Sequence, residues 1–162
     1  MGSPRDISLR TRSAGETQDL AAAMAVVAFP GDRLALVGPL GAGKTQFAKG
    51  FAVGLGIREI VNSPSFTLMA EYHGRLPLFH QDLYRLAGTE EALAGGLLDE
   101  RHDAGVTLSE WAERLDSELD PERLTIRLVP LADDGREVRV TGTGDAAARY
   151  VAAAAGWEAG RR

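Results

Sequence analysis

LALVGPLGAGKTQFAKGF, residues 34–51, is the stretch that decides the fold. Within it, GPLGAGKT at residues 38–45 satisfies the pattern G-x-x-x-x-G-K-[ST] of phosphate-binding loops. A polyphosphate must lie within hydrogen-bond reach of several backbone N–H groups, and glycine permits this because it has no Cβ and tolerates positive φ. Arg33 to Val37 is typical of a buried strand, and the apolar spacing from Lys44 to Leu55 predicts an amphipathic helix. Strand, loop and helix together predict a nucleotide site.

The side chains of this loop predict how a nucleotide would be held. The chain has only two lysines, Lys44 and Lys49, and we expect Lys44 to lie between the β- and γ-phosphates as a point charge. The wide planar fork of an arginine would not fit inside so tight a loop. We expect the Thr45 hydroxyl to ligate Mg²⁺, and Pro39, which lacks an N–H, to cost little phosphate binding. The predicted phosphate-binding residues are Gly41, Ala42, Gly43, Lys44, Thr45 and Gln46.

Composition limits the classes of function. The chain has 162 residues, a formal net charge of −5 and no cysteine, which excludes disulfides and thiolate metal sites. The acidic balance argues against stand-alone nucleic-acid binding. No run approaches the length of a membrane span, so we expect a cytoplasmic protein without a membrane partner and monomeric on its own. We expect one domain, residues 1–162, with its motifs in residues 31–115 and frayed ends.

The remaining pattern predicts an α/β protein. Helices alternate with strands early in the chain and hairpins follow, which predicts a mixed sheet, mostly parallel around the loop and extended by antiparallel hairpins. We expect strands at residues 7–11, 66–72, 76–86, 105–111, 123–131 and 136–142, and helices at residues 16–28, from Thr89 onward and at 145–155.

Two segments offer groups for the far side of the phosphates. The hydroxyls of Ser63, Ser65 and Thr67 lie in NSPSFTL, which reads equally well as a proline turn entering a strand. Glu110 ends the short apolar strand TLSE, where a carboxylate could hold Mg²⁺ opposite the loop. A solvated glutamate at the start of a helix is the alternative for Glu110.

A third segment, HQDLYRL, supplies Asp82. If Leu76, Leu78 and His80 share its face of the strand, the carboxylate ends a row of core side chains and needs a cation or a metal-bound water as partner. An ion pair with Arg85 is the alternative. We expect His80 to be a packed or surface histidine rather than a metal ligand.

These segments, taken in order, resemble one family. GPLGAGKTQFAKGFAVGLGI, NSPSFTLMAEYHGRLPLFHQDLYRL and TLSEWAERL are similar to the bacterial TsaE (YjeE) family of small P-loop ATPases. DLYRL following SPSFTL at this spacing is far more specific than the loop itself. The resemblance covers residues 31–115 and implies a single-domain P-loop fold.

The resemblance also implies a function. Members of the family take part in making N6-threonylcarbamoyladenosine in tRNA, and they bind ATP with Mg²⁺ and act on the TsaB–TsaD pair, in which TsaD transfers the threonylcarbamoyl group. This chain would then be a weak ATPase that meets tRNA only through those partners, which fits its negative charge. An arginine finger from Arg85 or from a partner would set the rate.

The resemblance assigns roles to individual residues. It implies that Thr45 and Glu110 hold Mg²⁺, and that Asp82 binds a metal-bound water or orients the attacking water. Lys44, Asp82 and Glu110 are therefore the expected catalytic residues. It also implies further nucleotide contacts: Ser65 and Thr67 near the γ-phosphate, Trp111 beside the metal, and Thr17 near the adenine.

Departures from the family pattern leave the chemistry intact. Pro39, Ser65, Gln81 and Ser109 replace the usual aspartate, threonine, phenylalanine and valine. Two other functions remain open: a small-molecule kinase, which would need an acceptor pocket and an arginine-rich lid, and a nucleotide-gated adaptor in which hydrolysis is incidental. A GTPase is disfavoured because the chain has no N-K-x-D motif.

Overall fold

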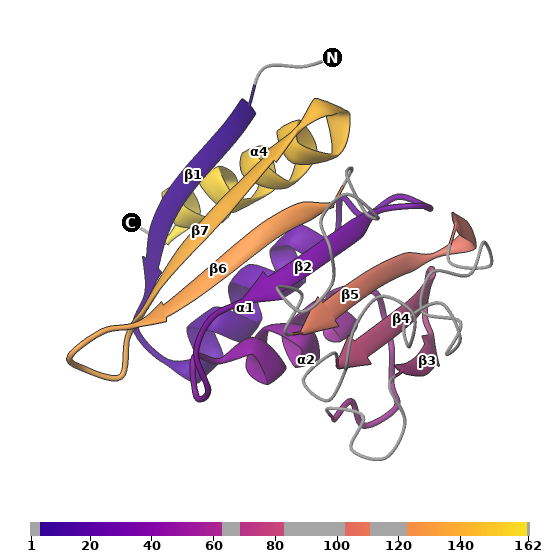
Figure 1. The fold of residues 1–162 in the computed structure, drawn as a ribbon, viewed down its shortest axis with the longest axis horizontal. Coiled ribbons are helices and arrows are strands. Elements are labelled where there is room, and N and C mark those ends of the chain that lie inside the picture. Colours follow the sequence, from indigo (N-terminus) through magenta and orange to yellow (C-terminus); the bar gives the residue numbers. More distant parts are fainter. Residues whose placement is uncertain (1–3, 63–68, 83–102, 111–122, 162) are drawn as a thin grey trace.

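A computed structural model describes residues 4–62, 69–82, 103–110 and 123–161 of the chain (Figure 1). Its strands are β1 (Pro4–Thr11), β2 (Arg33–Val37), β3 (Met69–His73), β4 (Pro77–Asp82), β5 (Val106–Glu110), β6 (Leu124–Pro130) and β7 (Arg136–Thr143). Its helices are α1 (Ala14–Ala25), α2 (Lys44–Gly54) and α4 (Gly144–Gly160). The helix expected from Thr89 onward lies outside the described residues.

The strands form one mixed sheet in the order β1-β7-β6-β2-β5-β4-β3. The pairs β2–β6, β2–β5 and β4–β5 are parallel and occupy the centre. The outer pairs β1–β7, β6–β7 and β3–β4 are antiparallel. The predicted single-domain α/β fold with a mixed sheet is confirmed, and the antiparallel additions make up half of the described pairings.

The three described helices cover one face of the sheet (Figure 1). Helix α1 packs on α2 and on α4, while α4 also packs on β1 and β7. Alternate residues of the strands point into this layer, so Leu36, Leu78 and Leu108 join Phe47 and Phe51 of α2 in one buried core. The parallel centre of the sheet and the start of α2 are thereby fixed relative to each other.

Helix α1 begins two residues earlier than the expected residue 16 and ends three residues before the expected residue 28. Ser13 caps its start, because the Ser13 hydroxyl accepts the backbone N–H of Glu16 at 3.1 Å. At the other end, the Arg75 guanidinium donates to the carbonyl oxygens of Ala25 at 3.0 Å and Ala28 at 3.2 Å. These carbonyls are satisfied without a further helical turn.

The ends were expected to be frayed, but their described parts, β1 and α4, are integral to the fold. Strand β1 pairs with β7 from Pro4↔Thr143 to Thr11↔Arg136. Helix α4 contributes Tyr150, whose side chain is fully buried. The alanine-rich sequence of this helix did not indicate such packing, because it has few large apolar side chains to mark a buried face. Small side chains nevertheless allow the helix to lie close against the sheet.

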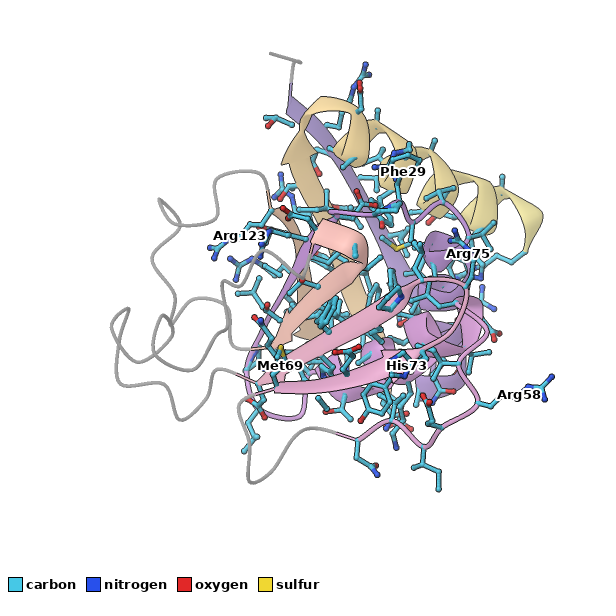
Figure 2. All side chains as sticks on the ribbon, turned by 90° about the vertical axis from the view of Figure 1, so that its right-hand side faces the viewer. Phe29, Arg58, Met69, His73, Arg75 and Arg123 are labelled. Atoms are coloured by element: carbon cyan, nitrogen blue, oxygen red, sulfur yellow. The ribbon has the colours of Figure 1, made fainter. Side chains whose placement is uncertain are left out.

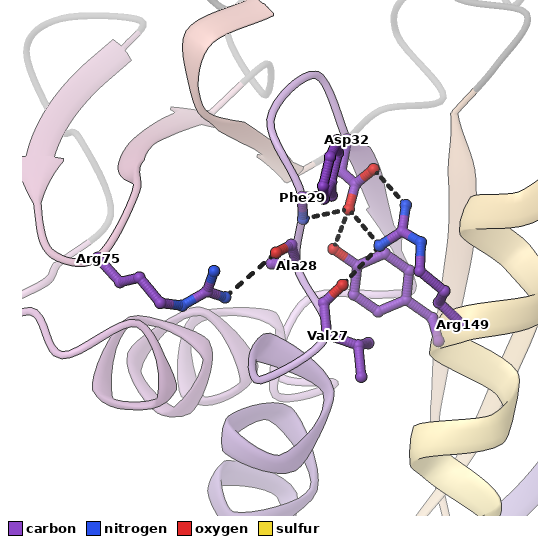
Figure 3. Close-up of polar contacts among 7 residues, drawn as sticks. Val27, Ala28, Phe29, Asp32, Arg75 and Arg149 are labelled. Atoms are coloured by element: carbon purple, nitrogen blue, oxygen red, sulfur yellow. Dashed lines mark hydrogen bonds and ion pairs between the residues drawn. The ribbon is translucent and has the colours of Figure 1, made fainter.

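A buried carboxylate fastens α4 to the loop that precedes β2 (Figure 3). Asp32 accepts two hydrogen bonds from the Arg149 guanidinium, at 2.8 and 3.0 Å, and one from the Tyr150 hydroxyl at 2.7 Å. The backbone N–H of Phe29 donates a further bond to Asp32 at 2.9 Å. Such bidentate, charge-assisted bonds are among the stronger ones in proteins. They hold the N-terminal end of β2 in place.

Tyr150→Phe is expected to lower the free energy of unfolding at neutral pH by about 1.5–3 kcal/mol, because it removes a buried hydrogen bond to a charged group. Burial, and next the nearby Asp32 charge, raise the pKa of Tyr150 well above its usual value. The unfolded chain therefore loses this proton first, from about pH 10 upward. The advantage of wild type over Tyr150→Phe should shrink above that pH by about 1.4 kcal/mol per pH unit. Urea unfolding of both chains at several pH values measures the difference, and a difference that stays constant into the alkaline range would contradict this account.

The β3–β4 hairpin is anchored to the C-terminal end of α2 and to the loop that follows this helix. The backbone N–H of Arg75 donates to Leu55 O at 2.7 Å, and the N–H of His73 donates to Glu59 at 3.3 Å. Figure 2 looks onto this side and shows Met69 and His73 on β3, with Arg58 projecting away from the body. The turn lies at the end of β4 away from Asp82, and the parallel pairing of β4 with β5 brings Asp82 to the edge of the sheet that carries the phosphate loop.

Candidate nucleotide site

The loop between β2 and α2 has the backbone conformation that its glycines predict. Gly41 and Gly43 have φ of 79° and 101°, a region that other residues rarely adopt. Lys44 begins α2, and its ammonium group folds back into the loop, donating to the carbonyl oxygens of Gly38 and Pro39. The loop therefore encircles a positive charge and directs the first N–H groups of α2 toward the cavity described below.

Gly38→Ala is expected to destabilise the fold by about 1–3 kcal/mol, as overpacking in a tight site does. A Cβ on Gly38 would lie 2.4 Å from the carbonyl oxygen of Leu128 and 3.1 Å from the Cβ of Ala42, at a φ of +152°. Gly156→Ala is the matched control, because a Cβ there meets nothing within 4 Å inside α4. It should stabilise slightly. Equal effects of the two substitutions in urea unfolding would contradict the close approach.

A cavity of about 450 Å³ opens in front of the loop, within the size range of ligand pockets. Asp82 and Glu110 lie in its wall because they are the last residues of the parallel strands β4 and β5 and pair in register. Leu78 and His80, on the same face of β4 as Asp82, are fully buried, as predicted for that strand. The residues lining the cavity are Leu40, Gly41, Ala42, Gly43, Lys44, Thr45, Gln46, Asp82, Glu110 and Arg136.

Glu110 receives a hydrogen bond on each carboxylate oxygen. The Thr45 hydroxyl donates to Oε1 at 3.2 Å, and His80 Nε2 lies 2.6 Å from Oε2. Glu110 is only 3% exposed. A buried glutamate at the end of a strand contradicts the alternative that Glu110 is a solvated residue at the start of a helix. His80 is packed, as expected. The alternating pattern of β4 indicated which face His80 occupies, but nothing in the sequence indicated its contact with Glu110.

The oxygen groups beside Thr45 fit a Mg²⁺ ion that binds together with a nucleotide, rather than a metal held permanently by protein side chains alone. The described part of the chain contains no cluster of three histidine, cysteine, aspartate or glutamate side chains able to hold a metal. It does offer the Thr45 hydroxyl beside the Glu110 carboxylate, with Asp82 in the same wall. Mg²⁺ in nucleotide sites takes one or two protein oxygens and completes its shell with phosphates and water. The donor set has the composition that this mode of binding requires.

Thr17 lies beside the phosphate loop, although it stands 26 positions before Gly43 in the sequence. A small hollow is lined by Ala14, Thr17, Gly43, Gln46, Asp134 and Arg136. The Thr17 hydroxyl lies 2.7 Å from the Thr11 hydroxyl and donates to Ser13 O at 3.2 Å. Gln46 accepts from Gln18 at 2.6 Å. These contacts fix the start of α1 against the loop, and contact between Thr17 and an adenine stays a prediction.

Arg136 is a site residue that the sequence did not reveal. From the start of β7, its guanidinium donates to the carbonyl oxygens of Ala42 at 2.9 Å and Gly41 at 3.1 Å. It therefore braces the loop from the β6–β7 side and lines the cavity. Its position after the predicted turn Asp134-Gly135 marked a strand start, and nothing local indicated a partner more than 90 residues away.

Several predicted site residues lie outside the described part of the chain. These are Ser65 and Thr67 of the segment expected near the γ-phosphate, Trp111 expected beside the metal, and Arg85, the alternative partner of Asp82 and candidate arginine finger. Their roles remain predictions.

A parallel sheet core, a G-x-x-x-x-G-K-T loop opening a helix, and carboxylates at the ends of neighbouring strands define a protein of the P-loop nucleoside-triphosphatase class. The chain belongs to the TsaE family: the model of that family, described as threonylcarbamoyl adenosine biosynthesis protein TsaE, matches residues 11–138.

Relatives agree over most of their length. The protein named tRNA threonylcarbamoyladenosine biosynthesis protein TsaE from Bacillus subtilis is 47% identical over 87% of this chain and 89% of the relative. The protein of that name from Treponema pallidum is 45% identical over 80% of this chain and 96% of the relative. A solved structure, the crystal structure of YdiB from Bacillus subtilis, matches with a TM-score of 0.72 and 39% identity and covers 100% of both chains.

No helix in the described residues is both long enough and apolar enough to cross a membrane.

Proposed function

We propose that this protein binds and hydrolyses ATP, with Mg²⁺, as a subunit required for the N6-threonylcarbamoyladenosine modification of tRNA. The observation that supports this best is the meeting of Thr45 and Glu110 in the wall of the loop cavity. It supplies the metal side of an ATP site in a chain whose relatives are named for this modification.

In this proposal the residues of the chain bind and orient the triphosphate. The N–H groups of residues 41–46 hold the phosphate oxygens, and Lys44 moves its ammonium from the loop carbonyls to the β- and γ-phosphates. Thr45 and Glu110 would hold Mg²⁺, which when bound neutralises charge on the β- and γ-phosphates. Pro39 O and Gly38 O release the lysine as the anion enters.

Asp82 acts on the attacking water. Its carboxylate lies opposite Glu110 in the register of β4 and β5 and lines the cavity wall. From there it accepts a hydrogen bond from a water aligned with the γ-phosphate, or from a water on Mg²⁺. Positioning of this kind accounts for most of phosphoryl-transfer catalysis. Slow turnover by the isolated chain follows if the arginine that completes the site comes from a partner.

The partners we propose are TsaB and TsaD, with TsaD carrying out the transfer and this chain resetting the complex. We further propose that tRNA meets only those partners, since the net charge of −5 disfavours direct contact. We place the chain in the cytoplasm, as a monomer before it joins the complex.

Reconstitution tests the proposal. Purified TsaB, TsaD, tRNA and the threonylcarbamoyl donor are incubated with and without this chain and ATP, and modified adenosine is counted per TsaD. Multiple turnover should require both the chain and ATP. Turnover that proceeds equally well without the chain would overturn the proposed function. A non-hydrolysable ATP analogue that sustains full turnover would show a nucleotide-gated adaptor instead of an ATPase.

A further inference from the structure

Buried beneath the predicted metal ligand is a histidine that the proposed mechanism has not used. His80 lies in the middle of β4 and is fully buried, next to the strand that ends in Glu110. Its Nε2 atom lies 2.6 Å from Glu110 Oε2. A histidine inside a parallel sheet is costly to bury unless its ring nitrogens find partners, and Nε2 finds its partner in the Glu110 carboxylate.

The hydrogen-bonding pattern assigns the tautomer of His80. Nδ1 is buried and has no hydrogen-bond partner among the described residues. The contact of Nε2 with Glu110 Oε2 decides the tautomer, because an ionised carboxylate only accepts hydrogen bonds, so the nitrogen 2.6 Å away must be the donor. The hydrogen therefore sits on Nε2, and His80 donates to Glu110.

This donor decides how Glu110 presents its carboxylate. The strand register places His80 opposite Leu108, which lies two residues before Glu110 on the same face of β5. The His80 ring therefore approaches the Glu110 carboxylate from the core side. Oε2 is taken by His80 and Oε1 faces the Thr45 hydroxyl. The carboxylate is thus turned with one oxygen anchored in the core and the other toward the cavity.

We propose that His80 is a positioning residue for the metal site: by donating from Nε2 to Glu110 Oε2, it fixes the orientation in which Oε1 and the Thr45 hydroxyl receive Mg²⁺. The inference rests on the proposed function. Groups that hydrogen-bond to metal ligands in this way change metal affinity by about 10- to 100-fold when removed. His80 is fully buried and is not among the residues that line the cavity, so metal-free nucleotide binding should not depend on it.

Three variants test this role. His80→Leu removes the N–H donor and fills the buried position with an apolar side chain. His80→Gln replaces the ring N–H by an amide N–H close to the position of Nε2. Leu78→Val is the matched control, because Leu78 lies two residues earlier on the same buried face of β4. ATP affinity is measured by calorimetry in EDTA, and MgCl₂ is then titrated at fixed ATP to find the concentration that gives half of the affinity gain.

His80→Leu should raise that Mg²⁺ concentration by about 10- to 100-fold and leave the ATP affinity in EDTA at the wild-type value. His80→Gln should restore the Mg²⁺ response. Leu78→Val should lower the melting temperature but leave the Mg²⁺ response at the wild-type value. A wild-type Mg²⁺ response in His80→Leu, an equal loss of affinity with and without Mg²⁺, or no rescue by glutamine would overturn the role of His80 alone. Wild-type protein whose ATP affinity ignores Mg²⁺ would overturn the proposed ATP·Mg²⁺ site, and the role of His80 with it.

Discussion

Replacing Lys44 by alanine is expected to abolish the thermal stabilisation that Mg-ATP gives the wild-type chain. At about 100 times its Kd, a ligand that binds only the folded state stabilises it by about 2.7 kcal/mol. Lys44 supplies the one side-chain ammonium enclosed by the loop, where Gly38 O and Pro39 O hold it within the cavity wall. Without this charge, the loop N–H groups alone face the triphosphate.

Lys49→Ala is the control for this experiment. Lys49 is the second of the two lysines in the chain and lies in the same helix, but it is not among the residues that line the cavity. Its removal changes the net charge equally and should leave the Mg-ATP shift intact. A Lys44→Ala chain that keeps the full shift in a thermal melt would show that the phosphate loop is assigned wrongly.

Asp82→Asn is expected to lower ATP turnover by about 10²- to 10⁴-fold, the contribution typical of a group that handles the reacting proton. Nucleotide affinity should change far less, because in the proposed mechanism the loop N–H groups and Lys44 hold the phosphates while Asp82, in the cavity wall, orients the water. Asparagine keeps the size of the side chain and one oxygen, so the wall of the cavity is retained. Single-turnover kinetics and calorimetry on the same preparation separate the two quantities.

Two comparisons make the Asp82 result specific. Glu110→Gln should reduce turnover and also weaken the Mg²⁺ response, since Glu110 contacts the Thr45 hydroxyl. Asp103→Asn, an exposed carboxylate outside the cavity, should change neither. If Asp82→Asn lost binding and turnover to the same extent, Asp82 would be a structural residue.

Local chemistry made the phosphate loop and both strand-end carboxylates predictable. The loop pattern depends on adjacent residues, and Asp82 and Glu110 each follow a short apolar run whose carboxyl end must meet the loop in a parallel sheet. The strand order depends instead on pairing between distant segments. The antiparallel pairing of Thr11 with Arg136 has no local signature, and neither does the contact of Arg136 with the Gly41 carbonyl.

Burial explains the other differences. His80 alternates with Leu78 and Asp82, which indicated its face but not its neighbour, because the neighbour depends on the register of β4 against β5. Tyr150 stands in a helix of alanines whose sequence gave no sign of the Asp32 carboxylate 118 residues away. Interactions of this kind are decided when whole elements pack, so a scan along the chain does not find them.

The pairing of β1 with β7 has a consequence for synthesis on the ribosome. Pro4 pairs with Thr143, so β1 has no partner in the sheet until β7 has emerged. Leu128 O, against which Gly38 packs, and Arg136, which braces Gly41 and Ala42, also arrive late. A nascent chain that displays the whole GPLGAGKT sequence thus still lacks the wall that shapes its loop, and the ATP binding that we propose would favour folding only after residues 128–136 have emerged.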